Sequence, residues 1–395
     1  MNPQLSHLQP YPFEKLRALL GGIPPPPLSP IRLSLGEPQH ATPDLIRQAL
    51  VDHLDGLSVY PATAGLDSLR ETIASWFRHR YALPHLDAAS EVLPVNGTRE
   101  ALFAIAQAVV DSSRPAPIVL CPNPFYQIYE GAAVLAGAEP VFLNQVADNG
   151  FGLDFDSVTD DQWRRTQLMY VCTPGNPAGR VLTLDDWQGL FDQSDRFDFV
   201  IASDECYSEI YPDEDTPPLG GLEAAHSLGR DNFRNLVVFA SLSKRSNAPG
   251  LRSGCVTGDA TLLRQFLLYR TYHGCAMSPA VQYASVAAWS DETHVRENRA
   301  RYRDKFATIV PMLQAALQAQ QPDAGFYLWA RVPGGDDAAF ARELYAATHV
   351  TVLPGQYLAR DAHGVNPGRG YVRIALVPEI SDCVEAARRI VEFCR

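Results

Sequence analysis

The chain lacks any apolar run long enough to cross a membrane. A transmembrane helix needs about 18–20 consecutive apolar residues, and no stretch of the 395 residues reaches that length. The first residues, Met1 to Pro12, also lack the basic region and apolar stretch of a secretory signal. We therefore expect a protein that neither spans nor binds a membrane and that works in the cytoplasm.

The chain also lacks an excess of positive charge. Its 33 lysines and arginines are outnumbered by 45 aspartates and glutamates, which gives a formal net charge of −12. Nucleic-acid-binding domains usually carry a basic surface, so this composition argues against DNA or RNA as a partner. A small anionic ligand is still allowed, because a cleft can hold local positive charge in an acidic protein.

The cysteine spacing matches neither a metal site nor a disulfide framework. There are seven cysteines, an odd number, and Cys121 and Cys172 lie inside apolar runs. Buried, reduced thiols give this pattern, so we expect no metal. The sequence also lacks an internal repeat, and no Gly-x-Gly-x-x-Gly motif follows a predicted strand, which argues against a dinucleotide-binding protein.

From about residue 92 onward, short apolar runs alternate with amphipathic stretches. Helical patterns cover residues 100–110 and 184–191, the second entered through Thr183 as an N-cap. The predicted strands are residues 92–95, 118–121, 168–172, 197–202, 236–240 and 255–257. This alternation predicts an α/β fold with a parallel or mostly parallel central sheet covered by helices on both faces.

The last third of the chain has a different pattern. Residues 291–320 form a long, charged helical stretch, and residues 325–330 and 370–376 are predicted as strands. Because 395 residues exceed one typical core, we expect two domains. We predict a large domain of residues 45–285 and a smaller α+β domain built from residues 1–44 and 286–395.

A lysine follows the predicted strand at residues 236–240, within Ser241-Leu-Ser243-Lys244. Burying an unpaired ammonium costs several kcal/mol, but desolvation also lowers the pKa of the amine, which can then form a Schiff base with a carbonyl. The two serines and Arg252 provide groups that can hold a phosphate. A reactive lysine beside a phosphate site indicates pyridoxal 5'-phosphate. A surface loop carrying a lysine and an arginine is the alternative, and the segment alone does not decide between them.

Polar residues follow almost every predicted strand. Ligands of open α/β sheets bind beyond the carboxyl ends of the strands, so these residues are expected to converge. Gly97, Thr98 and Arg99 open a helix whose free N–H groups suit a phosphate, although an ordinary helix start has the same pattern. The other residues at this rim are Tyr126, Asn176, Asp204 and Tyr207.

Each of these side chains suits one part of the cofactor, and each has a plainer alternative. Asp204 can pair with a protonated pyridine nitrogen, which keeps the ring an electron sink, or it can cap a helix. Tyr207 and Asn176 can donate to the phenolic oxygen of the cofactor, although Asn176 also suits a turn. Tyr126 can stack on the ring or simply pack. Arg373, in an apolar predicted strand, requires a carboxylate from a substrate or from the protein.

Together these motifs resemble those of the class I/II aminotransferases, which have the aspartate aminotransferase fold, PLP fold type I. The resemblance covers essentially the whole chain in order and spacing. It rests on Asn176-Pro-Ala-Gly179, Asp204-Glu-Cys-Tyr207, Ser241-Leu-Ser-Lys244, Pro249-Gly-Leu-Arg252 and the late Arg373.

The resemblance implies a role for each residue. Lys244 would hold the cofactor and carry the proton, Asp204 would pair with the pyridine nitrogen, and Arg373 would bind the substrate α-carboxylate with help from Gly36. Tyr60 matches a tyrosine that reaches the phosphate from the neighbouring subunit, which implies a homodimer with shared active sites. The phosphate would be held by Gly97, Thr98, the backbone N–H of Arg99, Ser241, Ser243 and Arg252, while Tyr126 would stack on the ring and Asn176 and Tyr207 would bond the phenolic oxygen.

A narrower resemblance is to the proteobacterial N-succinyl-L,L-diaminopimelate aminotransferases of lysine and cell-wall synthesis. It implies that glutamate donates the amino group, which N-succinyl-2-amino-6-oxopimelate accepts in a ping-pong cycle. Its segments are Pro10-Tyr-Pro-Phe-Glu-Lys-Leu-Arg17, Pro122-Asn-Pro-Phe-Tyr-Gln-Ile-Tyr-Glu130, Ser241-Leu-Ser-Lys-Arg-Ser-Asn-Ala-Pro-Gly250 and Tyr269-Arg-Thr-Tyr-His-Gly-Cys-Ala-Met277.

This acceptor carries extra carboxylates, so further cations are expected in the cleft. Arg270 lies where dicarboxylate-specific relatives place an arginine from the second subunit, although it can equally pair with a local carboxylate. Arg99 and Arg245 are further candidates. The same cofactor residues also serve other reactions. The alternatives are an aminotransferase for aspartate or aromatic substrates, a PLP-dependent lyase and, more remotely, a PLP-binding regulator.

Overall fold

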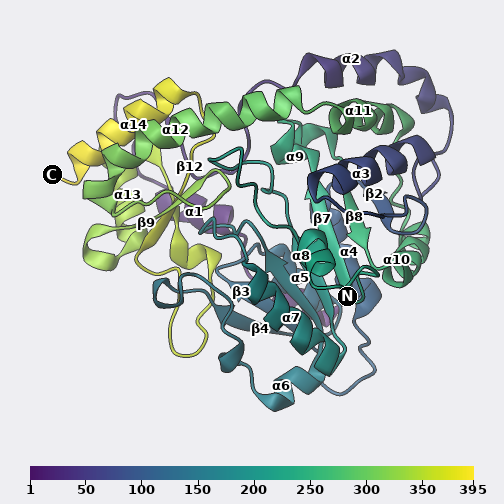
Figure 1. Cartoon of the computed structure of the whole chain (residues 1–395). Helices are drawn as coiled ribbons and strands as arrows, with labels where there is room; N and C mark the ends of the chain where they lie inside the picture. Colours follow the sequence, from purple (N-terminus) through teal and green to yellow (C-terminus); the bar gives the residue numbers. More distant parts are fainter.

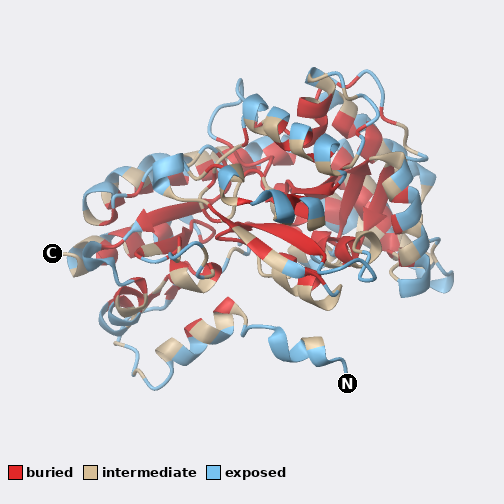
Figure 2. Ribbon diagram, turned by 90° about the horizontal axis from the view of Figure 1, so that it is seen from below, coloured by how far each residue is buried: buried red, intermediate tan, exposed pale blue.

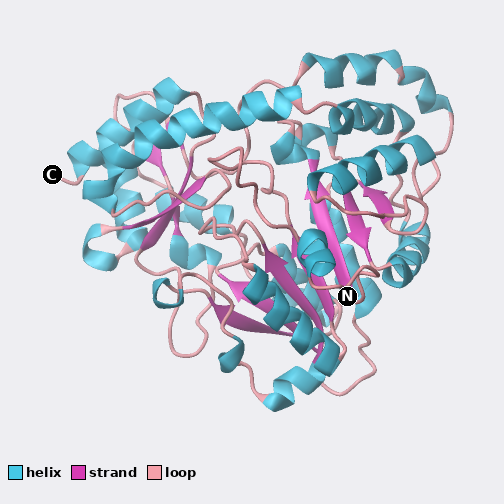
Figure 3. Cartoon of the chain, in the orientation of Figure 1, coloured by secondary structure: helices cyan, strands magenta, loops and turns pink.

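A seven-stranded sheet forms the framework of the larger part of the molecule (Figures 1 and 3). The computed structural model describes all residues from Met1 to Arg395. The strand order is β2-β8-β7-β6-β5-β3-β4, and only β8 runs antiparallel to its neighbours. The strands are β2 (Val92–Val95), β3 (Ile118–Asn123), β4 (Glu139–Asn144), β5 (Thr166–Cys172), β6 (Val200–Asp204), β7 (Leu236–Ser241) and β8 (Gly254–Gly258). The predicted mostly parallel α/β sheet is confirmed.

Two details differ from the sequence prediction. The strand predicted at residues 197–202 begins at Val200, because Phe197 still belongs to the preceding helix and Asp198 ends that helix in the left-handed conformation. Strand β4 was not predicted. It lies at the edge of the sheet, and Glu139 and Pro140 are not buried, so its first half lacks the apolar run that marks the inner strands.

Successive side chains along each strand point to opposite faces of the sheet, so the core forms two layers. In β6, Ile201 faces one layer while Val200 and Ala202 face the other. The first layer is covered by α3 (Asp67–Arg80), α7 (Leu184–Phe197), α8 (Gly221–Ser227) and α11 (Pro279–Ser290). The second is covered by α4 (Thr98–Val109), α5 (Ile128–Leu135) and α10 (Ala260–His273). Figure 2 shows the strands buried between helices whose outer faces are exposed.

A second, smaller unit contains the chain's C-terminal part and some N-terminal residues. It has its own apolar core. Its strands are β1 (Ile31–Arg32) paired with β10 (Val350–Thr351), and the antiparallel set β11 (Leu353–Pro354), β12 (Tyr371–Ala375) and β9 (Tyr327–Arg331). Its helices are α1 (Pro12–Leu20), α12 (Thr293–Leu317), α13 (Asp337–Thr348) and α14 (Ile380–Phe393). The domain bounds at residues 45 and 285 stay a prediction.

The remaining elements are short connectors. They are α2 (Asp44–Asp52), α6 (Asp160–Arg165), α9 (Leu242–Arg245), and the 3-10 helices η1 (Pro3–His7), η2 (Leu54–Ser58), η3 (Ala147–Asn149), η4 (Phe155–Ser157), η5 (Pro249–Leu251), η6 (Pro333–Gly335) and η7 (Gly355–Leu358). None of the helices is long and apolar enough to cross a membrane.

Candidate active site

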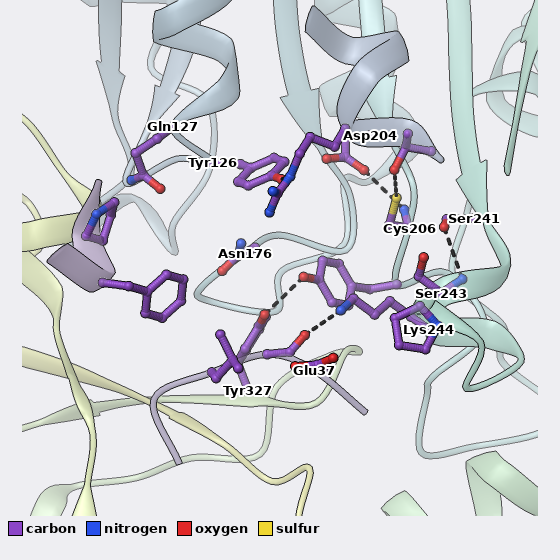
Figure 4. A pocket seen from close by; sticks show the side chains of 18 of the residues that line it. Glu37, Tyr126, Gln127, Asn176, Asp204, Cys206, Ser241, Ser243, Lys244 and Tyr327 are labelled. Carbon is purple, nitrogen blue, oxygen red and sulfur yellow. Dashed lines mark hydrogen bonds between the residues drawn. The ribbon is translucent and has the colours of Figure 1, made fainter. Parts of the chain in front are cut away.

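A cavity of about 490 Å³ lies where the carboxyl ends of β5, β6 and β7 meet the smaller unit (Figure 4). This volume is within the usual range for small-molecule sites, roughly 300–1,000 Å³. The predicted site residues that line it are Gly36, Thr98, Arg99, Tyr126, Asn176, Asp204, Tyr207, Ser241, Ser243, Lys244, Arg252 and Arg373. Residues more than 300 positions apart in the chain thus meet at one rim.

Lys244 extends into this cavity from the short helix α9, which directly follows β7. Its Nζ donates to the carbonyl of Gly36, and the face of Phe326 lies 5.4 Å away. Burial lowers the pKa of Lys244 to about 8, and the nearby positive charge of Arg373 acts in the same direction. The fraction of free, nucleophilic amine at neutral pH is therefore far larger than for an exposed lysine.

Only three lysines occur in the whole chain, at positions 15, 244 and 305. Lys15 lies on α1 outside the cavity wall, and Lys305 is buried within α12. Lys244 is therefore the one amine placed to react with a carbonyl inside this cavity.

Asp204 lies at the end of β6, on the face that carries α4 and α5. Its carboxylate accepts a hydrogen bond of 2.7 Å from the Tyr129 hydroxyl and one of 3.3 Å from the backbone N–H of Cys206. Burial raises the pKa of Asp204. A protonated pyridine nitrogen would offset this desolvation, because a buried carboxylate is stable only with partners. Strand alternation sends the next residue, Glu205, to the opposite layer, where it accepts from Tyr81.

A second group of residues forms a polar cradle at the N-terminus of α4. Gly97 has φ +83°, a backbone conformation that favours glycine, and a Cβ there would overlap the guanidinium of Arg252 in its observed position. Ser241 accepts from the N–H of Ser243 at 3.1 Å, and Arg252 donates to the carbonyl of Pro249 at 2.8 Å. Free helix N–H groups, hydroxyls and a guanidinium together suit a phosphate.

Arg373, in β12, is 4% exposed and points into the cavity. Its two terminal nitrogens donate to Asn176 Oδ1 and to the carbonyl of Ser34, each at 2.9 Å, while its Nε has no partner. No protein carboxylate pairs with it. The alternative of a structural ion pair for Arg373 is therefore wrong, and its charge is available to a ligand.

The sequence did not indicate two tyrosines that line the cavity or bond its lining residues. Tyr129 stacks on Tyr170 at 4.6 Å and bonds Asp204, and its position one helical turn after Tyr126 was the available signal. Tyr327 lies at 3.1 Å from the Tyr207 hydroxyl. Nothing in its apolar strand sequence indicated that contact, which joins residues 120 positions apart.

The structure contradicts two of the predicted substrate contacts. Arg270 is 1% exposed, and its Nη1 donates to both carboxylate oxygens of Glu100, at 2.6 and 2.8 Å. Arg245 is buried against Trp76 and Trp289 and pairs with Glu292. Each charge is already neutralised inside the protein, so neither arginine can bind a substrate carboxylate.

Residues 245–247 instead attach the segment around Lys244 to helix α12. Ser246 bonds His294 at 2.8 Å, and Asn247 bonds the side chain of Asn298 at 2.9 Å. Asn298 in turn donates to the carbonyl of Lys244 at 3.3 Å. The motif that suggested a subfamily thus holds the main chain of the reactive lysine in place.

Tyr60 lies outside the cavity. Its side chain is fully exposed, with a relative accessibility of 103%, in the loop after η2. Its predicted contact with the phosphate of a neighbouring subunit stays a prediction.

Comparisons with known proteins agree with this geometry. A family model described as "Aminotransferase class I and II" matches residues 29–390. The chain is 32% identical over 395 residues to an LL-diaminopimelate aminotransferase of Nitratidesulfovibrio vulgaris, covering 99% of this chain and 98% of that protein.

Two solved structures are similar over nearly their full length. One is an aminotransferase from Neisseria meningitidis, 52% identical, with a TM-score of 0.97 and 100% of both chains covered. The other is a probable N-succinyldiaminopimelate aminotransferase from Thermus thermophilus, 25% identical, with a TM-score of 0.84 and coverage of 97% and 98%. The chain therefore belongs to the class I and II aminotransferases, enzymes that depend on pyridoxal 5'-phosphate.

Proposed function

We propose that the cavity residues divide the work of transamination as their positions suggest. The bound cofactor supplies an aldehyde and a ring that withdraws electrons from the reacting carbon. Lys244 holds it and carries a proton to and from that carbon, and Asp204 keeps its ring nitrogen protonated. Its phosphate is bound by the cradle of Gly97, Thr98, Ser241, Ser243, Arg252 and the backbone N–H of Arg99, so the side chain of Arg99 stays free for the substrate. Tyr126 stacks on the ring, and Asn176 and Tyr207 donate to the phenolic oxygen. Arg373 binds the substrate α-carboxylate beside the backbone of Gly36.

The proposed substrates are glutamate, which donates the amino group, and N-succinyl-2-amino-6-oxopimelate, which accepts it to give N-succinyl-L,L-diaminopimelate; the reaction also runs in reverse. The observation that carries this proposal is Arg99. Its side chain lines the cavity, donates through Nε to the Tyr126 hydroxyl at 2.6 Å, and makes no ion pair. An unpaired arginine in addition to Arg373 suits a substrate with a carboxylate at its far end.

Apolar side chains in the cavity lining favour an acylated substrate. They are Pro12, Phe13, Leu35 and Leu358. The succinyl group presents methylenes and a neutral amide at the distal nitrogen, whereas a free distal ammonium is strongly hydrated and loses that hydration against apolar groups.

A second candidate substrate is free L,L-diaminopimelate. The curated relatives described as LL-diaminopimelate aminotransferases favour it. So does Glu37, the one lining carboxylate other than Asp204, because a distal ammonium would pair with it. In that case Glu37→Gln would weaken the reaction of the free diamine. With the succinylated substrate, which has no distal ammonium, it would leave the reaction unchanged.

Arg99→Gln is expected to lower kcat/KM for the diaminopimelate substrate by roughly 10- to 150-fold. This corresponds to one charge-assisted hydrogen bond of about 1.5–3 kcal/mol. Single-turnover half-reactions, followed through the absorbance of the cofactor, measure the effect. The matched control substrate is 2-aminoheptanoate, which lacks the distal carboxylate and should react equally with both enzymes. Equal losses for both substrates would contradict a distal role for Arg99.

We further propose a homodimer in which Tyr60 contributes to the neighbouring site. The segment from α2 through η2 exposes an unusual run of apolar side chains, namely Val51, Leu54, Leu57, Val59 and Tyr60. Contiguous exposed apolar surface of this kind marks an interface. Tyr60 lies at its end, where it would leave its own subunit.

Leu57→Asp is expected to convert a dimer, of twice the 43.4 kDa chain mass, into a monomer that binds the cofactor weakly. A charge placed in an apolar interface is costly because it must be desolvated. Light scattering gives the mass, and absorbance titration gives the cofactor affinity. Ile380→Asp, at an exposed apolar position on α14, is the control and should stay dimeric. A monomeric wild-type chain with full cofactor affinity would refute the proposal.

A further inference from the structure

Two buried tyrosine hydroxyls meet across the two units of the molecule. Tyr207 follows β6 of the large sheet, Tyr327 lies in β9 of the smaller unit, and their hydroxyl oxygens are 3.1 Å apart. Both side chains line the cavity and are less than 10% exposed. Figure 4 shows Tyr327 and Lys244 among the side chains that line the cavity.

The other face of Tyr327 contacts the carboxylate-binding arginine. The guanidinium of Arg373 lies 4.3 Å from the ring centre of Tyr327. In the antiparallel pair of β9 and β12, Tyr327 is opposite Ala375 and Arg373 is opposite Trp329. The two side chains are therefore diagonal neighbours on one face of the sheet, which is within reach for long side chains.

The position of the Tyr327 hydroxyl depends on Gly36. A Cβ at Gly36 would overlap this hydroxyl, so any larger residue would displace it. The carbonyl of Gly36 also accepts from Lys244. The missing side chain at Gly36 thus leaves space for the Tyr327 hydroxyl next to Tyr207.

We propose that Tyr327 is a positioning residue that directs the proton of Tyr207 toward the cofactor. A hydroxyl has one proton to donate. If Tyr207 donates to the phenolic oxygen of the cofactor, the contact with Tyr327 can exist only with Tyr327 as the donor. A hydroxyl that accepts a hydrogen bond becomes a stronger donor itself, because chained hydrogen bonds polarise one another. This inference rests on the proposed role of Tyr207.

This arrangement links two tasks through one side chain. The ring of Tyr327 packs against Arg373, which binds the substrate carboxylate. The hydroxyl of Tyr327 strengthens the hydrogen bond from Tyr207 to the phenolic oxygen of the cofactor. Because β9 belongs to the smaller unit and Tyr207 to the larger, the donation is strongest when the two units hold the observed contact.

The test is a pH titration of the holoenzyme's visible absorbance, without substrate. A weaker donor leaves less stabilisation for the deprotonated cofactor, so the cofactor keeps its proton to a higher pH. We expect Tyr327→Phe to raise the midpoint by a few tenths of a unit to about one unit. Tyr207→Phe should raise it further, and the double variant should match Tyr207→Phe alone.

The outcomes distinguish a failure of the role proposed for Tyr327 from a failure of the role proposed for Tyr207. A shift in Tyr207→Phe with none in Tyr327→Phe, or two shifts that add in the double variant, overturns the role of Tyr327 only. No shift in either variant overturns the role of Tyr207 as well.

A second measurement tests the ring of Tyr327 separately. Tyr327→Phe keeps the stacking on Arg373 and provides the reference value of the KM for glutamate. Tyr327→Leu removes it and should raise that KM roughly 2- to 30-fold, the range for a buried cation–π contact. Equal KM values for the two variants would overturn the stacking role.

Discussion

Lys244→Ala should lose the absorbance of the covalently held cofactor and at least about 10⁴-fold in transamination rate. The variant lacks both the nucleophile and the group that moves the proton, and general acid–base catalysis alone contributes up to about 10⁴-fold. The amine is suited to this work because burial lowers its pKa to about 8. Visible spectra and half-reaction rates at neutral pH measure both losses.

Lys305 provides a matched control for this prediction. Burial lowers its pKa to about 8 as well, and it is only 1% exposed. It lies outside the cavity, however, and donates to the carbonyls of Leu376 and Val377 at 3.1 and 3.3 Å. Lys305→Met should therefore lose stability but keep the cofactor absorbance.

Hydride reduction of the holoenzyme followed by peptide mass spectrometry adds an independent readout. The cofactor mass should be found on the peptide that contains Lys244. Label on Lys305, or a normal spectrum in Lys244→Ala, would refute the assignment. The comparison also shows that a lowered pKa alone does not identify a reactive lysine. Access to the cavity distinguishes the two.

The sequence predicted the rim of the large sheet well, because local rules govern it. Apolar runs of three to six residues marked these strands, and the polar residue at the end of each run therefore lies at the carboxyl end of a strand. For Asp204 and Ser241 the alternation along the strand also decides which layer the side chain faces. These residues follow from patterns of a few neighbouring positions.

The partners of the charged residues could not be predicted in the same way. The sequence left open whether Arg270 binds a substrate or a protein carboxylate, because its partner Glu100 lies 170 positions away in the chain. The hydrogen bond between Tyr207 and Tyr327 joins residues that are 120 positions apart in the chain and that belong to different units of the molecule. Such pairs depend on the packing of whole elements, and no local propensity encodes which side chains will meet.

Arg373→Ala should lower kcat/KM for every α-amino acid substrate by roughly 10²- to 10⁴-fold. A carboxylate bound by two charge-assisted hydrogen bonds loses about 1.5–3 kcal/mol for each. Arg373 has its Nε unpaired, and its terminal nitrogens contact only the neutral oxygens of Asn176 and Ser34. A carboxylate would therefore be its first charged partner, so the loss should be near the upper part of the range.

The conservative variant separates charge from shape. Arg373→Lys keeps a positive charge but loses the planar fork that matches a carboxylate, so it should recover only part of the rate. Arg331→Ala, at the exposed end of neighbouring β9, is the control and should react as the wild type. A normal cofactor spectrum in each variant verifies that the site is folded.

The decisive substrate for Arg373 is one without an α-carboxylate. 4-Aminobutyrate is glutamate without that group, and its slow reaction should be the same in Arg373→Ala and in the wild type. A similar loss of rate with both amines would mean that Arg373 supports the fold of the cavity and does not bind the α-carboxylate. A loss confined to glutamate requires the guanidinium to act on that carboxylate, since the two amines differ in nothing else.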